Sequence, residues 1–307
     1  MLGVIYDLES NPKRAMLPPE KVHRAVRAIE IALDDEFGWV TEDHLDHLYG
    51  LLQHCSSVLL KGRFHLPFST TAYKQAHIRK YAQVHHAWRM ELVWWRTLLT
   101  NWNCVALILP LYQTVPGKYG LLAPTQDACR SLQKMSGGGG AVYGVRYQHY
   151  LFTPEEITWL TIMDLEGLVL IVWMHTLCMI CPEEISGKRF LSWCDNDSVV
   201  KAVQKNGSNK PTLAFIIGIL HDLQSRFSFD LELQWIDTKS NRLADALSRN
   251  ELNEFFVEMC KLGHSRESLV LVPVQETQRS AWSLTMRRLR QTETALLQPL
   301  APATLQE

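Results

Sequence analysis

The sequence predicts an α/β protein in which a sheet with flanking helices follows a mostly helical unit. Two observations predict this class. Residues 121–256 alternate strand and helix signals in the order ββαβααβα, whereas residues 1–103 show one strand signal followed by helical periodicity. The chain has 307 residues, of which 47% are hydrophobic, so it is long enough for about two domains with packed cores.

The first 103 residues begin as a strand and continue as helices. Met1–Leu8 (MLGVIYDL) has the alternation of a short strand. The segment Leu17-Pro18-Pro19-Glu20 is a helix start, because the first turn tolerates a residue without an N–H. Further helices are expected from Thr41 and across about 72–99. The expected divisions are 1–16 as a terminal strand segment, 17–103 as a helical unit and 104–120 as a linker.

Residues 121–256 supply the expected sheet. The run Gly137–Gly140 is a tight-turn signal between two strands. Thr153-Pro154-Glu155-Glu156 starts a helix that carries Glu166, and the buried strand Arg189–Cys194 ends at Asp195. A strand at Phe229–Ile236 and a helix at Arg242–Ser248 complete the pattern. Residues 257–307 are polar without a clear repeat of packed elements, and we interpret them as a tail or a docking segment.

Charge is distributed unevenly along a chain whose formal net charge is -1. Residues 54–103 carry seven basic side chains against Glu91 alone, interleaved with aromatic rings. Cations neutralise phosphate and flat rings stack on bases, so this stretch suits a nucleic-acid backbone. The alternative is a solvated helical face over an aromatic core. The candidate nucleic-acid contacts in this stretch are Lys61, Arg63, Arg79 and Lys80.

Cysteine usage and hydropathy indicate an intracellular protein. The seven cysteines are odd in number and scattered, and no signal-peptide pattern precedes them. We therefore expect a reducing compartment, the cytoplasm or the nucleus, and no disulfide framework. The most apolar run, Gly167–Cys181, is shorter than the roughly 20 residues that a bilayer requires, so a buried helix is expected and no membrane contact. Its Cys178 and Cys181 lack a second pair at zinc spacing, which favours a place in the core.

Four acidic residues stand near strand ends and helix starts: Asp127, Glu166, Asp195 and Asp245. Carboxylates delivered from such positions can converge on one edge of a sheet. Four of them offer enough hard oxygen and negative charge for two Mg²⁺ ions, or Mn²⁺ in their place. Two ions roughly 3.5–4 Å apart can clamp an in-line phosphoryl displacement. The alternatives are a helix cap at Asp195, a surface acid at Asp245 and a loop acid at Asp127.

Two segments carry a family resemblance. Phe190–Ser208 (FLSWCDNDSVVKAVQKNGS) and Leu231–Arg249 (LELQWIDTKSNRLADALSR) resemble the ribonuclease H domain of retroelement reverse transcriptases, in particular the DIRS/Ngaro-like (tyrosine-recombinase) retrotransposon group. Upstream, MLGVIYDL, LPPEK, Lys61–Phe64 and Glu91–Trp95 resemble the primer-grip end of the palm, the thumb and the connection of the same polyproteins. The resemblance covers roughly residues 1–256.

The resemblance implies a ribonuclease H fold, with a five-stranded mixed sheet and helices on both faces, and hydrolysis of the RNA strand of an RNA–DNA hybrid. It implies that Asp127 bridges two metal ions, that Glu166 and Asp195 complete one metal site, and that Asp245 holds the ion that activates the attacking water. Asn196 and Asn241, beside these acids, are further expected contacts of the hybrid. The polymerase aspartates would belong to a fingers and palm portion outside this sequence, so that portion is an expected partner and no polymerase activity is expected here.

The first acidic motif departs from the family pattern and leaves two alignments open. In the family, Asp-Ala-Ser/Cys is followed within a few residues by a glycine-rich turn, whereas here Arg130–Ser136 intervene. Asp127 can still be the ligand if the hairpin loop is enlarged, because closure cost grows slowly with loop length. In the other alignment Met135-Ser136 matches the motif and Lys134 replaces the aspartate, which would abolish catalysis.

Two functions of different class follow. One is a metal-dependent ribonuclease H module with a hybrid-binding thumb/connection. The other is a catalytically decayed or repurposed fragment that keeps the fold and binds nucleic acid or a protein partner. An exonuclease or integrase-like nuclease would share the acids and would prefer single-stranded or duplex DNA.

Overall fold

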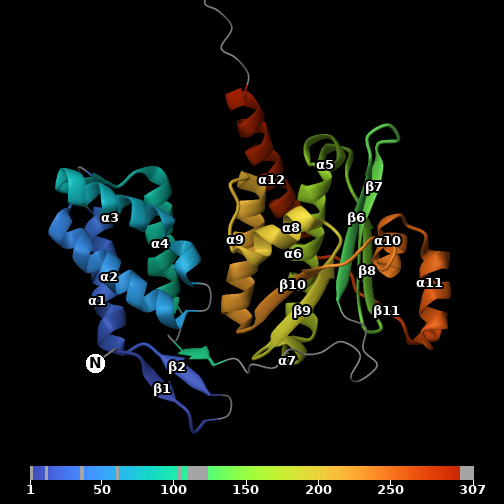
Figure 1. Cartoon of the computed structure of the whole chain (residues 1–307), viewed down its shortest axis with the longest axis horizontal. Helices are drawn as coiled ribbons and strands as arrows, with labels where there is room; N and C mark the ends of the chain where they lie inside the picture. Colours follow the sequence, from blue (N-terminus) through green and yellow to red (C-terminus); the bar gives the residue numbers. More distant parts are fainter. Residues whose placement is uncertain are drawn as a thin grey trace, which may run out of the picture. The chain divides into compact units, whose positions relative to one another are not determined.

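The structure is a computed structural model that describes residues 3–10, 13–34, 38–59, 62–101, 105–108 and 124–297 (Figure 1). The chain forms two compact units. The first comprises Met1–Leu111 with two short later segments, and the second comprises most of the remainder. Lys61, the side chain of Arg63 and most of the expected linker 104–120 lie outside the described residues.

The first unit contains four α-helices and two small sheets among its described residues. Trp88, Trp95, Leu45, Leu48 and Ile29 are fully buried between the helices, so the aromatic residues of the basic stretch contribute to a core. The helices are α1 (Pro19–Asp34), α2 (Glu42–Val58), α3 (Pro67–Arg79) and α4 (His86–Asn101), with a 3₁₀ turn at Gly62–His65. The strands are β1 (Ile5–Asp7), β2 (Arg14–Met16) and β5 (Val105–Leu107) in one sheet, and β3 (Trp39–Thr41) and β4 (Tyr81–Gln83) in the other.

The prediction of one helix across 72–99 is wrong, because two separate helices, α3 and α4, cover this range. Lys80 ends α3 in the left-handed conformation, with φ of 71°, and the next three residues pair with β3. The buried carboxylate of Glu91, on α4, accepts hydrogen bonds from the backbone amides of Phe68 and Ser69 at 2.9 and 2.8 Å. These are amides that the first turn of a helix leaves without partners. The one acidic residue of the basic stretch therefore caps α3.

The second unit is built on a mixed sheet with helices on its faces, as the sequence predicts. Strand order is β10-β9-β6-β7-β8-β11. Neighbours in β6–β7–β8 run antiparallel, whereas β9 is parallel to β6 and β11 is parallel to β8. Five strands were expected, and the sixth, β11, is added at an edge. The strands are β6 (Thr125–Ser131), β7 (Ser136–Tyr143), β8 (Arg146–Leu151), β9 (Arg189–Cys194), β10 (Asp230–Trp235) and β11 (Val270–Leu271).

The glycine run is not a turn, which corrects the sequence interpretation. Gly137–Gly140 lie inside β7, and the turn that joins it to β6 comprises residues 132–135. A Cβ at Gly140 would come within 2.5 Å of Leu247 Cβ in α10 (Arg242–Ser248), and one at Gly139 within 2.5 Å of Val169 Cγ2 in α6 (Ile162–Ile180). Alternate residues of a strand face opposite sides, so the glycines admit a helix closely on each face of the sheet.

The register of this hairpin also settles where Asp127 lies. Asp127 pairs directly with Gly140, so no enlarged loop is needed. Lys134 is exposed in the turn between the two strands. The alignment that replaces the aspartate by Lys134 therefore puts the lysine away from the position at which the acids meet.

Helix α6 is the central helix of the second unit. Thr153 does start a helix, α5, but that helix ends at Trp159, and Glu166 lies on α6, which begins anew at a second capping box formed by Thr161 and Asp164. By length and composition α6 could cross a membrane, yet 83% of its most apolar window is buried, as in the core helix of a soluble domain. The other helices are α5 (Pro154–Trp159), α7 (Pro182–Ile185), α8 (Asp197–Gln204), α9 (Pro211–Phe227), α11 (Leu252–Lys261) and α12 (Glu276–Leu297).

Of the two interpretations of residues 257–307, a tail or a docking segment, the structure supports the docking segment for their described part. β11 extends the sheet beside β8, and α12 packs on α5 and α6 (Figure 1). Trp282 and Met286 are buried in this contact, but its two ends are made by arginines, Arg279 and Arg290, that pair with buried acids. A search for apolar periodicity misses such an interface because arginines occupy two of its positions.

Candidate active site

The four acids named from the sequence line one pocket of about 370 Å³ in the second unit. Strands β6 and β9 run parallel with Gln126 opposite Cys194, so Asp127 and Asp195 follow at adjacent places on the same sheet edge. Glu166 comes from α6 on one face, and Asp245 comes from α10 on the other. The remaining lining residues include Arg130, Ile162, Asn196, Thr238 and Arg249.

Asp127 is buried, with 4% of its surface exposed. The hydroxyl of Ser248 donates a hydrogen bond to its Oδ2. Burial, followed by the nearby charges of Asp195 and Asp245, raises the pKa of Asp127 to about 7, although the Ser248 hydrogen bond opposes the shift. Without a bound metal ion, this carboxyl group therefore takes up a proton far more readily than an exposed aspartate.

Glu166 is the most deeply buried acid of the pocket, with 3% exposed. It accepts a hydrogen bond from the backbone amide of Ala128, while its Oε2 has no hydrogen-bond partner among the described residues. Burial, and then the charges of Asp127 and Asp195, raise its pKa well above the ordinary range. A buried carboxylate oxygen without a partner is costly, and a bound cation would satisfy it.

Asp195 and Asp245 are partly exposed and are held by side chains of the loop and helix that follow β10. Thr238 Oγ1 donates to Asp195 Oδ2 at 3.0 Å, and the Trp235 indole N–H donates to the Asp195 carbonyl at 3.0 Å. Burial raises the pKa of Asp195. Asp245 forms an ion pair with Arg249 one turn along α10, with Nε 2.8 Å from Oδ1. Both acids therefore have a fixed carboxylate at the pocket wall.

The donor set fits a hard divalent cation. Carboxylate oxygens predominate, and these are the ligands that Mg²⁺ and Mn²⁺ prefer in proteins. Glu166 contributes the orphaned Oε2, and ligand atoms of Glu166, Cys194 and Asp195 all lie within 4.8 Å of one another. Cys194 was not expected here. Burial and then the charge of Glu166 raise its pKa well above the ordinary value, which keeps it a neutral thiol.

The expected nucleic-acid contacts fall into three groups. Asn196 lines the pocket and also caps α8 through the backbone amide of Val199. Arg79 and Lys80 are exposed at the end of α3, where Lys80 pairs with Glu42 at 2.8 Å. Asn241 does not fit the expectation, because it is buried and its Nδ2 donates to the carbonyl of Gln126 at 3.1 Å. Its Nδ2 holds the start of α10 against β6.

Several residues that line the pocket or contact its acids were missed from the sequence. Ser248 and Arg249 follow Asp245 by three and four residues, so helical spacing alone could have placed them beside it. Thr238 lies on the loop after β10, and Arg130 lies near the end of β6, where its Nε donates to the carbonyl of Ile157 at 2.9 Å. No local pattern marks either of these two, since their neighbours in the pocket come from distant parts of the chain.

Comparison with known proteins finds likeness among solved structures alone. No protein-family model and no curated protein matches the chain. Among solved structures, RNase H1 from the halophilic archaeon Halobacterium salinarum NRC-1 aligns with a TM-score of 0.31 and 15% sequence identity. The alignment covers 43% of this chain and 97% of the archaeal one.

Proposed function

We propose that the second unit is a divalent-metal-dependent ribonuclease H-type endonuclease, which cuts the RNA strand of an RNA–DNA hybrid as part of a retroelement reverse transcriptase. The observation that carries this proposal is the convergence of Asp127, Glu166, Asp195 and Asp245 on one pocket from two strands and two helices. The sequence resemblance around Asp195 and Asp245 supports the substrate and the retroelement origin.

The roles proposed for the acids are those that the family resemblance implies. Asp127, Glu166 and Asp195 would hold one Mg²⁺ ion, and Asp127 with Asp245 would hold a second. Such a pair supplies an activated water and a charge clamp for in-line attack on a phosphodiester. The chain's own contribution is to keep the acids together. Ser248 orients Asp127, and Thr238 orients Asp195.

The first unit is proposed to bind the backbone of the hybrid. Its described basic residues include Arg79 and Lys74, both exposed. Exposed cations that neutralise phosphates raise the affinity for nucleic acid, and this gain becomes smaller as the salt concentration rises. The fingers and palm of the polymerase remain the proposed protein partner, on the sequence resemblance alone.

The test is a cleavage assay with the full chain, Mg²⁺ and a hybrid labelled on either strand. The RNA strand should be cut and the DNA strand left intact, and chelation of the metal should stop the reaction. Asp195→Asn should lower the rate by at least about 100-fold, since losing even an outer-shell partner of a metal costs about 10–100-fold. Asp197→Asn is the matched control, because Asp197 is exposed and pairs with Lys201 at the surface.

Three other outcomes would each reject the proposal. Cutting of single-stranded or duplex DNA in preference to the hybrid would indicate an exonuclease or integrase-like activity. Hybrid binding without any cutting would indicate a decayed or repurposed fragment. Equal rates for wild type and Asp195→Asn would mean that the observed cutting does not come from this pocket.

A further inference from the structure

The C-terminal helix α12 is attached to the second unit by two arginines on one of its faces. Arg279 and Arg290 are 11 residues apart, which is about three helical turns. Arg279 Nη1 lies 2.8 Å from Glu156 Oε1, and Arg290 Nε lies 2.8 Å from Asp164 Oδ2. Each partner is the third helical residue of a capping box, Glu156 in α5 and Asp164 in α6. The helix therefore engages the first turns of both α5 and α6.

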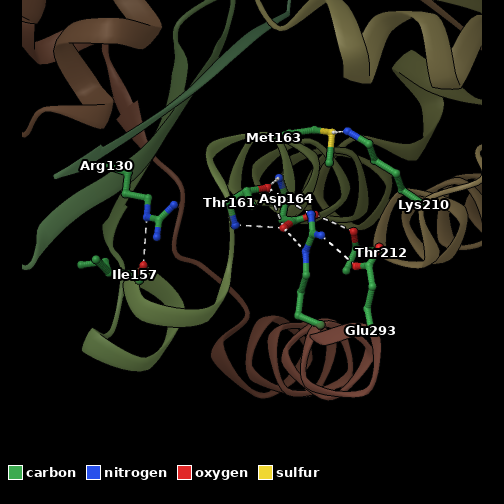
Figure 2. A network of polar contacts seen from close by, with 9 residues as sticks. Arg130, Ile157, Thr161, Met163, Asp164, Lys210, Thr212 and Glu293 are labelled. Carbon is green, nitrogen blue, oxygen red and sulfur yellow. Dashed lines mark hydrogen bonds and ion pairs between the residues drawn. The ribbon is translucent and has the colours of Figure 1, made fainter. Parts of the chain in front are cut away.

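Asp164 is the centre of the denser of the two contacts. Its carboxylate is fully buried and accepts five hydrogen bonds. The donors are the backbone amide and hydroxyl of Thr161, the hydroxyl of Thr212 at the start of α9, and two nitrogens of Arg290. Figure 2 shows the side chains of Thr161 and Thr212 directed at Asp164. Arg290 supplies the positive charge that a buried carboxylate requires.

The same helical turn leads into the candidate active site. Ile162, at the start of α6, lines the pocket, and Glu166 follows Asp164 by two residues on α6. A helix turn transmits a displacement of its first residues to the next turn, since each backbone hydrogen bond links residues four apart. Any loosening of Thr161–Asp164 would therefore move the carboxylate of Glu166 relative to the acids on β6 and β9.

We propose that Arg290 is a positioning residue of the metal centre, which acts through Asp164 to fix the first turns of α6 and with them Glu166. The inference rests on the proposed function, because it assigns Glu166 a metal to hold. It makes α12 a functional part of the nuclease unit.

The second arginine supplies a matched control. Arg279 is on the same helix, and its pair with Glu156 has 7% and 3% of the two side chains exposed, against 17% and 0% for Arg290 and Asp164. Glu156 belongs to α5, however, and α5 contributes none of the residues that line the pocket. Arg279→Met and Arg290→Met therefore each remove one arginine of α12 that pairs with a buried acid, and the acid that loses its arginine in the second variant lies on α6, the helix that carries Glu166.

The experiment measures two properties of the full chain for wild type, R279M and R290M. Hydrogen exchange of a peptide spanning residues 161–168 reports the opening of the first turns of α6, and titration with Mn²⁺ followed by electron paramagnetic resonance reports metal affinity. We expect faster exchange in this peptide and an affinity loss of about 10-fold in R290M, as for other outer-shell partners of metals. R279M should match wild type in both. Arg290→Lys, which keeps the charge, should restore part of the affinity and serves if R290M does not fold.

The outcomes separate this inference from the proposed function. Equal effects of R279M and R290M, or no effect of either, would overturn the positioning role and leave metal binding by the wild type intact. Wild type that binds no Mn²⁺ would reject the proposed function and with it the metal role of Arg290. In that case faster exchange in R290M, but not in R279M, would still show that Arg290 of α12 stabilises the first turns of α6.

Discussion

Replacing Gly140 by alanine tests whether the close approach of α10 to β7 builds the pocket. A Cβ at this position would lie 2.5 Å from both Leu247 Cβ and Ser248 N, and 2.6 Å from the Ala244 carbonyl oxygen. Ordinary contacts begin at 3.4 Å, so α10 must move by about 0.9 Å, the difference between 3.4 and 2.5 Å. Two of the three atoms are backbone, and no side-chain rotation relieves the clash.

The expected cost follows from this displacement. Overpacking of a core typically costs about 1–3 kcal/mol, and we expect the upper part of this range because the obstructing atoms are backbone. At about 2–4 °C per kcal/mol for a unit of this size, the midpoint of thermal unfolding should fall by about 4–12 °C. Asp245 and Ser248 both lie on α10, so metal affinity should fall together with stability.

The assay is thermal unfolding followed by circular dichroism, with and without Mg²⁺. Gly207→Ala is the control, because nothing lies within 4 Å of a Cβ at Gly207, and the change should be neutral or stabilise by up to about 1 kcal/mol. A Gly140→Ala protein as stable as the control would refute the close packing of α10 on β7.

Three further predictions follow from individual side chains. The pKa of Asp127 is raised to about 7, so the metal-free folded state holds a proton that the unfolded state releases near 3.8, and the free energy of unfolding should fall as pH rises from about 4 to 7. The difference in this free energy between pH 5 and pH 8, measured by denaturant unfolding, should be smaller for Asp127→Asn than for wild type. An equal difference in the two proteins would contradict the assignment. Ser248→Ala removes the hydroxyl that donates to buried Asp127, and should cost about 1–3 kcal/mol in urea unfolding; a cost near zero would show that the hydrogen bond contributes little. Arg79→Gln should weaken hybrid binding equally for all sequences and reduce the salt slope by about 1, and an unaltered slope would remove Arg79 from the contact surface.

The sequence was sufficient for the parts of the fold that depend on local pattern. Asp195 could be placed at the end of a buried strand because six residues, Arg189–Cys194, read as that strand, and the structure has the same bounds. The start of α2 after Thr41 was likewise predictable from its cap, and the burial of α6 from its apolar run. The four acids could be named from their places near strand ends and helix starts, and the structure brings all of them to one pocket.

The rest depended on contacts between distant segments. Glycines 137–140 resemble a turn locally, and only the packing of α6 and α10 on the two faces of β7 explains why a strand needs them. The role of α12 was hidden for a similar reason. The side of α12 that packs on α5 and α6 carries Arg279, Trp282, Met286 and Arg290, and the two arginines belong to it because buried acids at the starts of α5 and α6 pair with them.

A crystal structure of the full chain soaked with Mn²⁺, with the ions located by anomalous scattering, tests the central claim most directly. The account predicts Mn²⁺ in the pocket, bound by carboxylate oxygens of Asp127, Glu166 and Asp195, with Glu166 Oε2 among the ligands. Manganese absent from this pocket, or bound only at other acids of the surface, would contradict it.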